Sequence, residues 1–235
     1  MSKAIEKTII ALDGMKQDEV YKFLDELGSK ICFVKIGLEL YLRYGGSFVE
    51  KIKEKYNHKI FLDLKIHDIP QTVNKAISSL EGLPIDFLTI HLTGGREMMK
   101  QALVSASKHL PTTKLLGVTY LTSLSEDDIK EIWSNESKNL YENLLKIACE
   151  EKFHGLILSP LELELVNRFE KKYSHKFIKV TPGIRFSSDN NNDQKRIATP
   201  VKAFESGANY LVIGRPITLP ANRDKNLEEL RNLNV

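Results

Sequence analysis

The sequence is short of cysteine, of tryptophan and of long apolar runs. Cysteine occurs twice in 235 residues and tryptophan once. Cys32 and Cys149 lie far apart in a strand-like and a helix-like segment, so we expect buried free thiols in a reduced, cytoplasmic setting and no disulfide framework. No apolar run approaches the roughly 18–20 residues that span a membrane, and the short polar N-terminus lacks the apolar core of a signal peptide.

The sequence also has no large excess of charge of one sign. The 34 Lys and Arg residues and the 31 Asp and Glu residues give a net charge of +3 and are spread along the chain. A nucleic-acid-binding protein concentrates its basic excess in a patch, so we expect neither a nucleic-acid partner nor a membrane partner. No His, Cys or acidic residues have convincing metal-ligand spacing, so we expect no metal site.

Short β-branched segments alternate with longer amphipathic segments along the whole chain. This alternation predicts parallel strands joined by helices. The predicted strands are residues 8–12, 31–36, 59–65, 87–91, 114–119, 155–158, 177–180 and 210–213. The predicted helices begin near Asp18 and then cover residues 48–56, 72–80, 97–109, 140–152, 160–173 and 200–206. We expect an α/β fold, a single-domain (β/α)8 TIM barrel over residues 1–235, with an open flavodoxin-like sheet as the alternative.

The third predicted strand carries charged residues where a barrel strand is buried. Side chains alternate between the two faces of a strand, so Asp63 and Lys65 are expected to face the barrel interior. Lys35 on the second strand faces inward beside them. We expect a charged cluster from three neighbouring strands at the C-terminal rim, made of Asp13, Lys35, Asp63, Lys65 and Asp68.

This cluster predicts decarboxylation chemistry. A lysine between two carboxylates is favoured in its protonated form, so Lys65 between Asp63 and Asp68 is expected to be a proton donor and not a Schiff-base nucleophile. Such an ammonium stabilises and protonates the carbanion that remains when a substrate carboxylate leaves as carbon dioxide. The alternative is an ion-pair network that only fixes the barrel. We favour catalysis, since buried networks seldom improve stability and barrel enzymes work on this face.

Two Gly-Arg motifs indicate a phosphate site. Gly183 and Arg185 follow the seventh predicted strand, and Gly214 and Arg215 follow the eighth. Loops after strands 7 and 8 commonly bind phosphate in barrels, through backbone N–H groups and arginine. The stretch at 186–193 is rich in Ser and Asn and has little apolar content, so we expect a mobile loop that acts as a lid.

Residues Asp63-Leu64-Lys65-Ile66-His67-Asp68-Ile69-Pro70-Gln71-Thr72 resemble the signature of the orotidine 5'-phosphate decarboxylase family. Further matching blocks occur in order over almost the whole chain: Ala11-Leu12-Asp13, Val34-Lys35-Ile36-Gly37, His91-Leu92-Thr93-Gly94-Gly95, Leu121-Thr122-Ser123, Pro182-Gly183-Ile184-Arg185, Asp193-Gln194-Lys195-Arg196 and Ile213-Gly214-Arg215-Pro216-Ile217-Thr218. After Ile217-Thr218 the family often continues with small residues and an Asp-Pro pair, where this chain reads Leu219-Pro220-Ala221-Asn222-Arg223-Asp224.

The resemblance implies decarboxylation of orotidine 5'-monophosphate to UMP in pyrimidine biosynthesis, without a metal or an organic cofactor. Lys65 would protonate C6 of the pyrimidine. The family is usually a homodimer in which Asp68 and Thr72 would reach the partner's site. The implied catalytic residues are Lys65, Asp63, Asp68 and Lys35. The implied substrate-binding residues are Asp13, Lys35, Asp63, Thr72, Thr122, Arg185, Gln194, Gly214 and Arg215.

Two other functions stay open from the sequence. One is a related sugar-phosphate decarboxylase, which would need a magnesium-binding acidic residue but neither Thr122 nor the Gln194 lid. The other is a non-catalytic nucleotide-binding protein on the same barrel. His91 ends the fourth predicted strand, where it either supports the rim or reaches the site.

Overall fold

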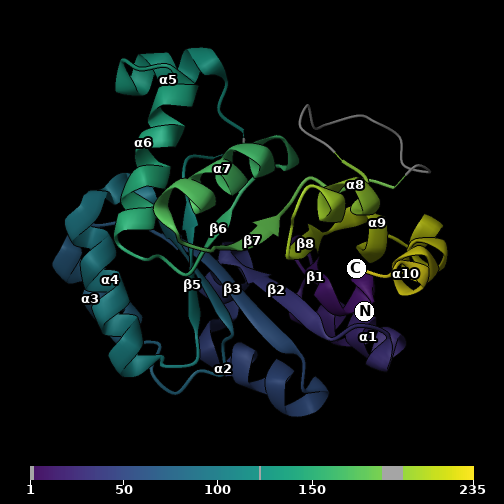
Figure 1. The fold of residues 1–235 in the computed structure, drawn as a ribbon. Coiled ribbons are helices and arrows are strands. Elements are labelled where there is room, and N and C mark those ends of the chain that lie inside the picture. Colours follow the sequence, from purple (N-terminus) through teal and green to yellow (C-terminus); the bar gives the residue numbers. More distant parts are fainter. Residues whose placement is uncertain (1–2, 122, 187–197) are drawn as a thin grey trace.

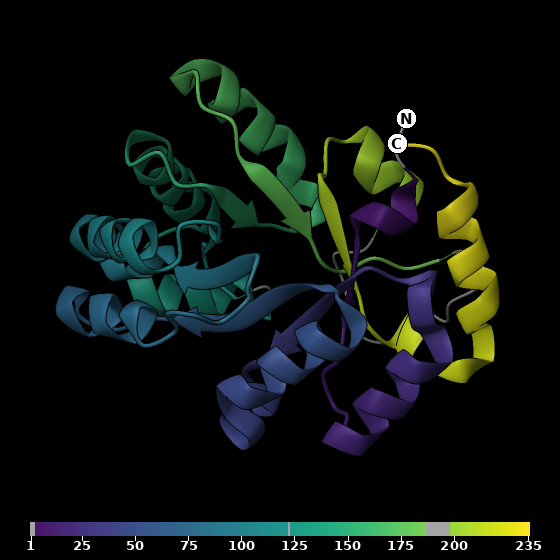
Figure 2. The same cartoon turned by 90° about the horizontal axis from the view of Figure 1, so that it is seen from below.

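The computed structural model describes residues 3–121, 123–186 and 198–235. In these ranges eight parallel strands close into a barrel in the order β1-β2-β3-β4-β5-β6-β7-β8, and helices surround it (Figures 1 and 2). The predicted TIM barrel is therefore confirmed over the open flavodoxin-like sheet. No helix among the described residues is long and apolar enough to span a membrane.

The strands lie close to the segments predicted from β-branched residues. Their bounds are β1 Thr8–Ala11, β2 Phe33–Gly37, β3 Lys59–Ile66, β4 Phe87–His91, β5 Lys114–Val118, β6 Gly155–Ile157, β7 Ile178–Thr181 and β8 Tyr210–Ile213. Because β2 begins two residues later than predicted, Cys32 lies outside it. Both cysteines are free thiols, but the prediction that both are buried is wrong, since Cys32 is exposed and only Cys149 is buried.

The helices alternate with the strands and cover the outside of the barrel. Their bounds are α1 Gln17–Leu27, α2 Leu38–Tyr56, α3 Pro70–Ser78, α4 Gly95–His109, α5 Glu126–Trp133, α6 Ser137–Glu150, α7 Leu163–Tyr173, α8 Pro200–Glu205, α9 Arg215–Thr218 and α10 Arg223–Asn232. Short 3-10 turns are η1 Ala4–Lys7, η2 Gly28–Lys30, η3 Leu92–Gly94, η4 Pro160–Glu162 and η5 Pro220–Asn222.

Four helices differ clearly from the sequence prediction. The helix α2 begins ten residues earlier than predicted and bends at Gly45, whose φ of 66° lies in the left-handed region that glycine adopts easily. The helices α5, α9 and α10 lie outside the predicted helical ranges. The helix α10 begins at Arg223, in the stretch that departs from the family pattern, and it packs on η1 and α9.

The core has two layers because strand side chains alternate. Inside the barrel, buried side chains from six strands pack together: Ile9, Phe33, Phe61, Phe87, Leu116 and Val180. Aromatic rings dominate this layer, with the Phe33 and Phe87 centroids 5.1 Å apart. The neighbouring residues Val34, Ile36 and Leu62 belong to the outer layer, between strands and helices. This apolar plug fills the barrel beneath the charged residues of its C-terminal end.

Candidate active site

The strand β3 departs from regular pairing where its charged residues lie. Leu62 pairs with Leu88 of β4, and the next pair is Ile66 with Ile90. Between these pairs β3 advances by four residues and β4 by two, so β3 contains two extra residues. Within this bulge Lys65 has a φ of 50°. A non-glycine residue in the left-handed region costs on the order of 1–3 kcal/mol, and such strain is concentrated at functional sites.

Because of the bulge, Lys65 does not owe its position to regular strand alternation. Regular alternation along β3 holds through Asp63, but the position of Lys65 follows from the irregular backbone. Its N–H leaves the strand ladder and donates to Thr89 Oγ1 at 2.9 Å. Thr89 on β4 is fully buried and donates its own hydroxyl to Asp63 Oδ1 at 2.9 Å. The Thr89 hydroxyl therefore holds both the strained backbone at Lys65 and the Asp63 carboxylate by hydrogen bonds.

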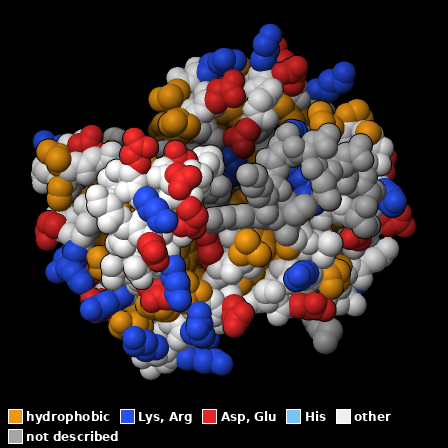
Figure 3. Space-filling model, turned by 90° about the horizontal axis from the view of Figure 1, so that it is seen from above, with side chains coloured by type: hydrophobic (Ala, Val, Ile, Leu, Met, Phe, Trp, Pro, Cys, Tyr) orange, Lys and Arg blue, Asp and Glu red, His pale blue; other side chains and the backbone are white. Residues whose placement is uncertain are grey.

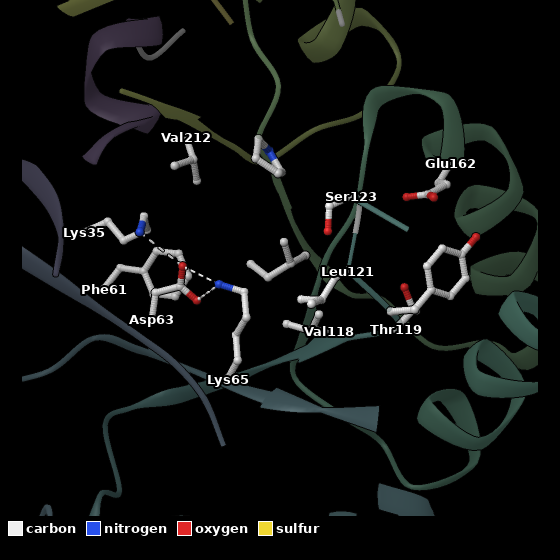
Figure 4. Close-up of a pocket in the computed structure, with 13 residues that line it drawn as sticks. Lys35, Phe61, Asp63, Lys65, Val118, Thr119, Leu121, Ser123, Glu162 and Val212 are labelled. Carbon is white, nitrogen blue, oxygen red and sulfur yellow. Dashed lines mark hydrogen bonds and ion pairs between the residues drawn. The ribbon is translucent and has the colours of Figure 1, made fainter. Parts of the chain in front are cut away.

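Asp63 is the centre of the charged cluster. Lys65 Nζ lies 2.8 Å from each of its carboxylate oxygens, and Lys35 Nζ lies 3.2 Å from Oδ2 (Figure 4). Burial by itself would raise the pKa of Asp63, but the charges of Lys35 and Lys65 and the hydrogen bonds from Lys65 and Thr89 hold that pKa below its usual value. The carboxylate is therefore ionised and aligned along the lysine ammonium.

Lys35 joins Asp63 to the end of β1. Its ammonium lies 2.7 Å from Asp13 Oδ2, and burial of the amine, which would lower its pKa, is outweighed by Asp63 and Asp13. The net result is a raised pKa for Lys35. Gly37 makes room for this pair, since a Cβ there would lie 2.1 Å from Asp13 Oδ1. The predicted Asp13–Lys35–Asp63–Lys65 arrangement is thus assembled in one chain.

The cluster opens into a cavity of about 220 Å³ at the C-terminal end of the barrel. Figure 3 looks onto this end, where acidic and basic side chains border a hollow. In Figure 4, Lys35, Asp63 and Lys65 lie on one side of the cavity, and Ser123 and Glu162 lie on the other. Its remaining wall consists mainly of aliphatic and aromatic side chains: Phe61, Val118, Thr119, Tyr120, Leu121, Ile157, Pro182 and Val212. A flat ring fits this space, with its faces against the apolar wall and one edge toward the charged residues.

Asp68 and Thr72 do not reach this cavity in the single chain. Asp68 is exposed and accepts from the N–H of Ile69 at 2.7 Å, and Thr72 is exposed on α3. Among the described residues, the carboxylate paired with Lys65 is that of Asp63. Ile69, between the two, leaves 66% of its surface exposed. One chain therefore assembles only half of the predicted carboxylate pair around Lys65.

The predicted phosphate residues follow β7 and β8, as expected from their spacing. Arg185 is partly buried and donates to Ile184 O at 2.9 Å, and its own N–H donates to Ala198 O at 3.0 Å. Gly214 precedes α9, and Arg215 is the first residue of that helix and is exposed. The cavity wall includes Pro182, which directly follows β7, and Val212, which lies within β8.

Two predicted substrate residues lie outside the described residues. These are Thr122 and Gln194, together with most of the predicted lid at 186–193. The structure adds residues that the sequence prediction missed. Ser123 lines the cavity, and it is the neighbour of Thr122 in a block already matched to the family. Thr89 could have been found by alternation on β4, since it shares a face with Phe87.

His91 lies beside the cluster without joining its hydrogen bonds. Its ring centroid is 5.2 Å from that of His67. Burial, the neighbouring His67 and the charge of Lys65 lower the pKa of His91 to about 4, although Asp63 opposes them. His91 is therefore neutral at physiological pH and is a packing partner at the rim. Within the described ranges, no three His, Cys, Asp or Glu side chains are grouped to hold a metal ion.

Comparison with known proteins agrees with this geometry. Residues 6–230 match the model of the Orotidine 5'-phosphate decarboxylase / HUMPS family. An orotidine 5'-phosphate decarboxylase from Ehrlichia chaffeensis is 45% identical over 224 residues, covering 94% of each chain. One from Fusobacterium nucleatum is 38% identical over 231 residues, covering 97% of this chain and 95% of the other.

A solved structure shares the fold as well as the sequence pattern. The crystal structure of orotidine 5'-phosphate decarboxylase from Lactobacillus acidophilus has a TM-score of 0.80 and 34% sequence identity, covering 97% of this chain and all of the other. Family, relatives and fold agree over nearly the whole length. The chain belongs to the orotidine 5'-phosphate decarboxylase family.

Proposed function

We propose that this chain converts orotidine 5'-monophosphate to UMP and carbon dioxide, in pyrimidine biosynthesis, with Lys65 as the proton donor. The observation that carries the proposal is the contact of Lys65 Nζ with both oxygens of Asp63 at the wall of the cavity. The family and the named relatives support the reaction. The site residues and the roles below are our assignment.

The reaction places its developing charge beside the Lys65 ammonium. The bond between C6 and the carboxylate carbon breaks, carbon dioxide leaves, and the electron pair stays on C6. The ammonium stabilises this pair by a charge that is already in place, and then transfers a proton to form the C6–H bond. Asp63 keeps the ammonium in position, and its pKa below the usual range keeps it ionised. Lys65 regains a proton from solvent.

The rest of the site orients the substrate. Asp13 and Lys35 lie at the end of the charged row where they can bind ribose hydroxyls, and Thr122 is assigned to the pyrimidine ring. For the phosphate we assign residues from the loops after β7 and β8: Arg185, Gln194, Gly214 and Arg215. Phosphate binding far from the reacting carbon contributes energy that orients the ring against Lys65.

We further propose a homodimer in which Asp68 and Thr72 complete the partner's site. The exposure of both residues, and of the apolar Ile69 between them, supports this arrangement. A cytoplasmic location stays a prediction, which fractionation of the source cells would test.

The reaction is tested by following the ultraviolet absorbance of orotidine 5'-monophosphate with EDTA-treated protein. We expect full turnover and stoichiometric UMP. Loss of turnover with EDTA, restored by magnesium, would favour the metal-dependent sugar-phosphate decarboxylases. Binding of UMP without turnover would favour a nucleotide-binding protein.

The shared site is tested by mixing two inactive variants, Lys65→Ala and Asp68→Ala. If Asp68 acts across the dimer, each mixed dimer holds one intact site, and random exchange of subunits restores about a quarter of the wild-type rate. If Asp68 acts on the Lys65 of its own chain, mixing restores nothing. The two variants carry tags of different mass, so that native mass spectrometry of the mixture resolves the mixed dimer from the two homodimers and confirms that subunits have exchanged.

A further inference from the structure

The phosphate residues Gly214 and Arg215 lie on a structure that cannot hold itself in place. Gly214 precedes α9 and Arg215 is its first residue, and this helix has only four residues, Arg215–Thr218. Nucleation of a helix is unfavourable, and one of this length is not stable without tertiary contacts. Its last carbonyl groups also have no partner within the helix. The position of Gly214 and Arg215 therefore depends on whatever binds the other end of α9.

Backbone N–H groups donate hydrogen bonds only to the first carbonyl groups of α9. Gly214 O accepts from the N–H groups of Ile217 and Thr218, and Arg215 O accepts from that of Leu219. The carbonyls of Pro216, Ile217 and Thr218 remain. All three accept from side chains of α10.

Two buried side chains of α10 make these bonds. Arg223 Nε donates to Ile217 O at 2.9 Å, and Arg223 Nη2 donates to Thr218 O at 3.1 Å. Asn226 Nδ2 donates to Pro216 O at 2.9 Å. Arg223 is 9% exposed and Asn226 is fully buried. Buried donors aimed at successive carbonyls fix both the position and the rotation of α9.

Arg223 is itself held from the opposite side. Its Nη1 lies 2.7 Å from Glu26 Oε1, and its guanidinium carbon lies 5.1 Å from the ring centroid of Phe23. Glu26 and Phe23 are both on α1. The planar guanidinium thus joins α1, α9 and α10, which a lysine ammonium could do with only part of these contacts.

We propose that Arg223 and Asn226 are positioning residues for the substrate phosphate, because they fix the turn that presents Gly214 and Arg215. This inference rests on the proposed function. Neither residue lines the cavity. A shift of the turn weakens phosphate binding and reduces the energy that orients the ring, whereas the Lys65 cluster is untouched. The defect is therefore specific to substrates that carry the phosphate.

The test compares two substrates, orotidine 5'-monophosphate and orotidine, which lacks the phosphate. Arg223→Met keeps the apolar stem and removes the three N–H contacts. We expect kcat/KM for the phosphorylated substrate to fall about ten- to a hundredfold, with orotidine changed less than about twofold. Asn226→Leu should act in the same direction, and Arg223→Lys should fall between wild type and Arg223→Met.

Arg96→Met is the matched control. Arg96 binds Glu150 and Glu151, and its helix α4 lies on the opposite side of the barrel from α9 (Figure 1), so both substrates should keep their wild-type kinetics. Thermal unfolding of each variant sets an assay temperature at which all are folded. Equal losses for the two substrates in Arg223→Met would show a purely structural role and overturn the proposal. So would an unchanged kcat/KM for orotidine 5'-monophosphate.

UMP binding separates this proposal from the proposed function. Isothermal titration of UMP needs no turnover, and Arg223→Met should raise its Kd by a factor similar to the kinetic loss. Wild-type protein that binds UMP but does not decarboxylate would overturn the proposed reaction and leave the positioning role to be judged by this Kd. An unchanged Kd in Arg223→Met would overturn the positioning role alone.

Discussion

Two buried clusters of lysine and carboxylate lie in this barrel, and their surroundings differ. At the C-terminal mouth, Asp63 binds Lys35 and Lys65 at the wall of a cavity. On the outside of the sheet, Glu170 of α7 binds Lys179 of β7, whose ammonium lies 3.0 Å from Glu170 Oε2. Lys179 faces outward because its neighbours on β7 face the interior.

The outer cluster is satisfied within itself. Glu170, with a side chain 1% exposed, also accepts from the N–H of Phe177 at 2.8 Å, and Lys179 donates to Asn167 Oδ1 at 2.8 Å. The mouth cluster instead has a strained backbone at Lys65, whose side chain is 36% exposed and lines the cavity. Residue types alone do not separate a catalytic cluster from a structural one. The cavity, the strain and the accessible donor do.

The largest expected contrast is in turnover. Asp63→Asn keeps the shape of the side chain but removes the charge that positions Lys65, so kcat/KM should fall about a thousandfold or more. Glu170→Gln makes the same chemical change in the outer cluster and should keep kcat/KM within about twofold. The ultraviolet assay at a temperature where both variants are folded measures this. Comparable losses of kcat/KM in the two variants would contradict the assignment of one cluster to catalysis and the other to structure.

The second contrast is in stability, where the change in the outer cluster is expected to have the large effect. Glu170→Gln leaves the Lys179 ammonium buried without its carboxylate, and should lower the free energy of unfolding by about 3–5 kcal/mol. Glu164→Gln, an exposed carboxylate on the same helix, should change it by less than about 0.5 kcal/mol. Urea denaturation followed by circular dichroism gives both values. A similar, small effect for the two variants would contradict a structural role for Glu170.

A third prediction concerns the hydroxyl that joins β4 to the strained turn. Thr89→Val leaves the Lys65 N–H and Asp63 without that partner, so we expect a cost of about 1–3 kcal/mol in stability and about tenfold in kcat/KM. Thr181→Val is the control, because Thr181 is also fully buried and its hydroxyl has no hydrogen-bond partner among the described residues. That variant should be neutral or more stable. Equal behaviour of the two would remove Thr89 from the site.

The smallest expected effect is in the acid dependence of stability. The pKa of His91 falls from 6.5 to about 4 on folding, so between these values the unfolded chain binds a proton that the folded chain does not. His91 thus contributes stability above pH 6.5 that is lost as the pH falls toward 4. His91→Gln should narrow the difference in unfolding free energy between pH 7 and pH 5. Parallel curves for variant and wild type would contradict this.

The alternation of β-branched and amphipathic segments predicted the barrel, and the alternation of side chains along regular strands placed Lys35 and Asp63 inside. It could not predict the bulge, since the two extra residues of β3 are defined only against β4. The ion pair between Glu170 and Lys179 could not be predicted either, because it depends on how α7 packs over β7. Asp68 was identified from a sequence pattern, but its partner lies beyond what one chain shows.

The central claim is that Lys65, held by Asp63, donates the proton that completes decarboxylation. The most direct measurement is the rate of orotidine 5'-monophosphate decarboxylation by Lys65→Ala beside wild type, followed by ultraviolet absorbance. We predict that kcat falls about 10,000-fold or more, because proton donation and charge stabilisation are lost together, while the thermal unfolding curve and UMP binding persist. A Lys65→Ala protein that turns over at the wild-type rate would contradict the account.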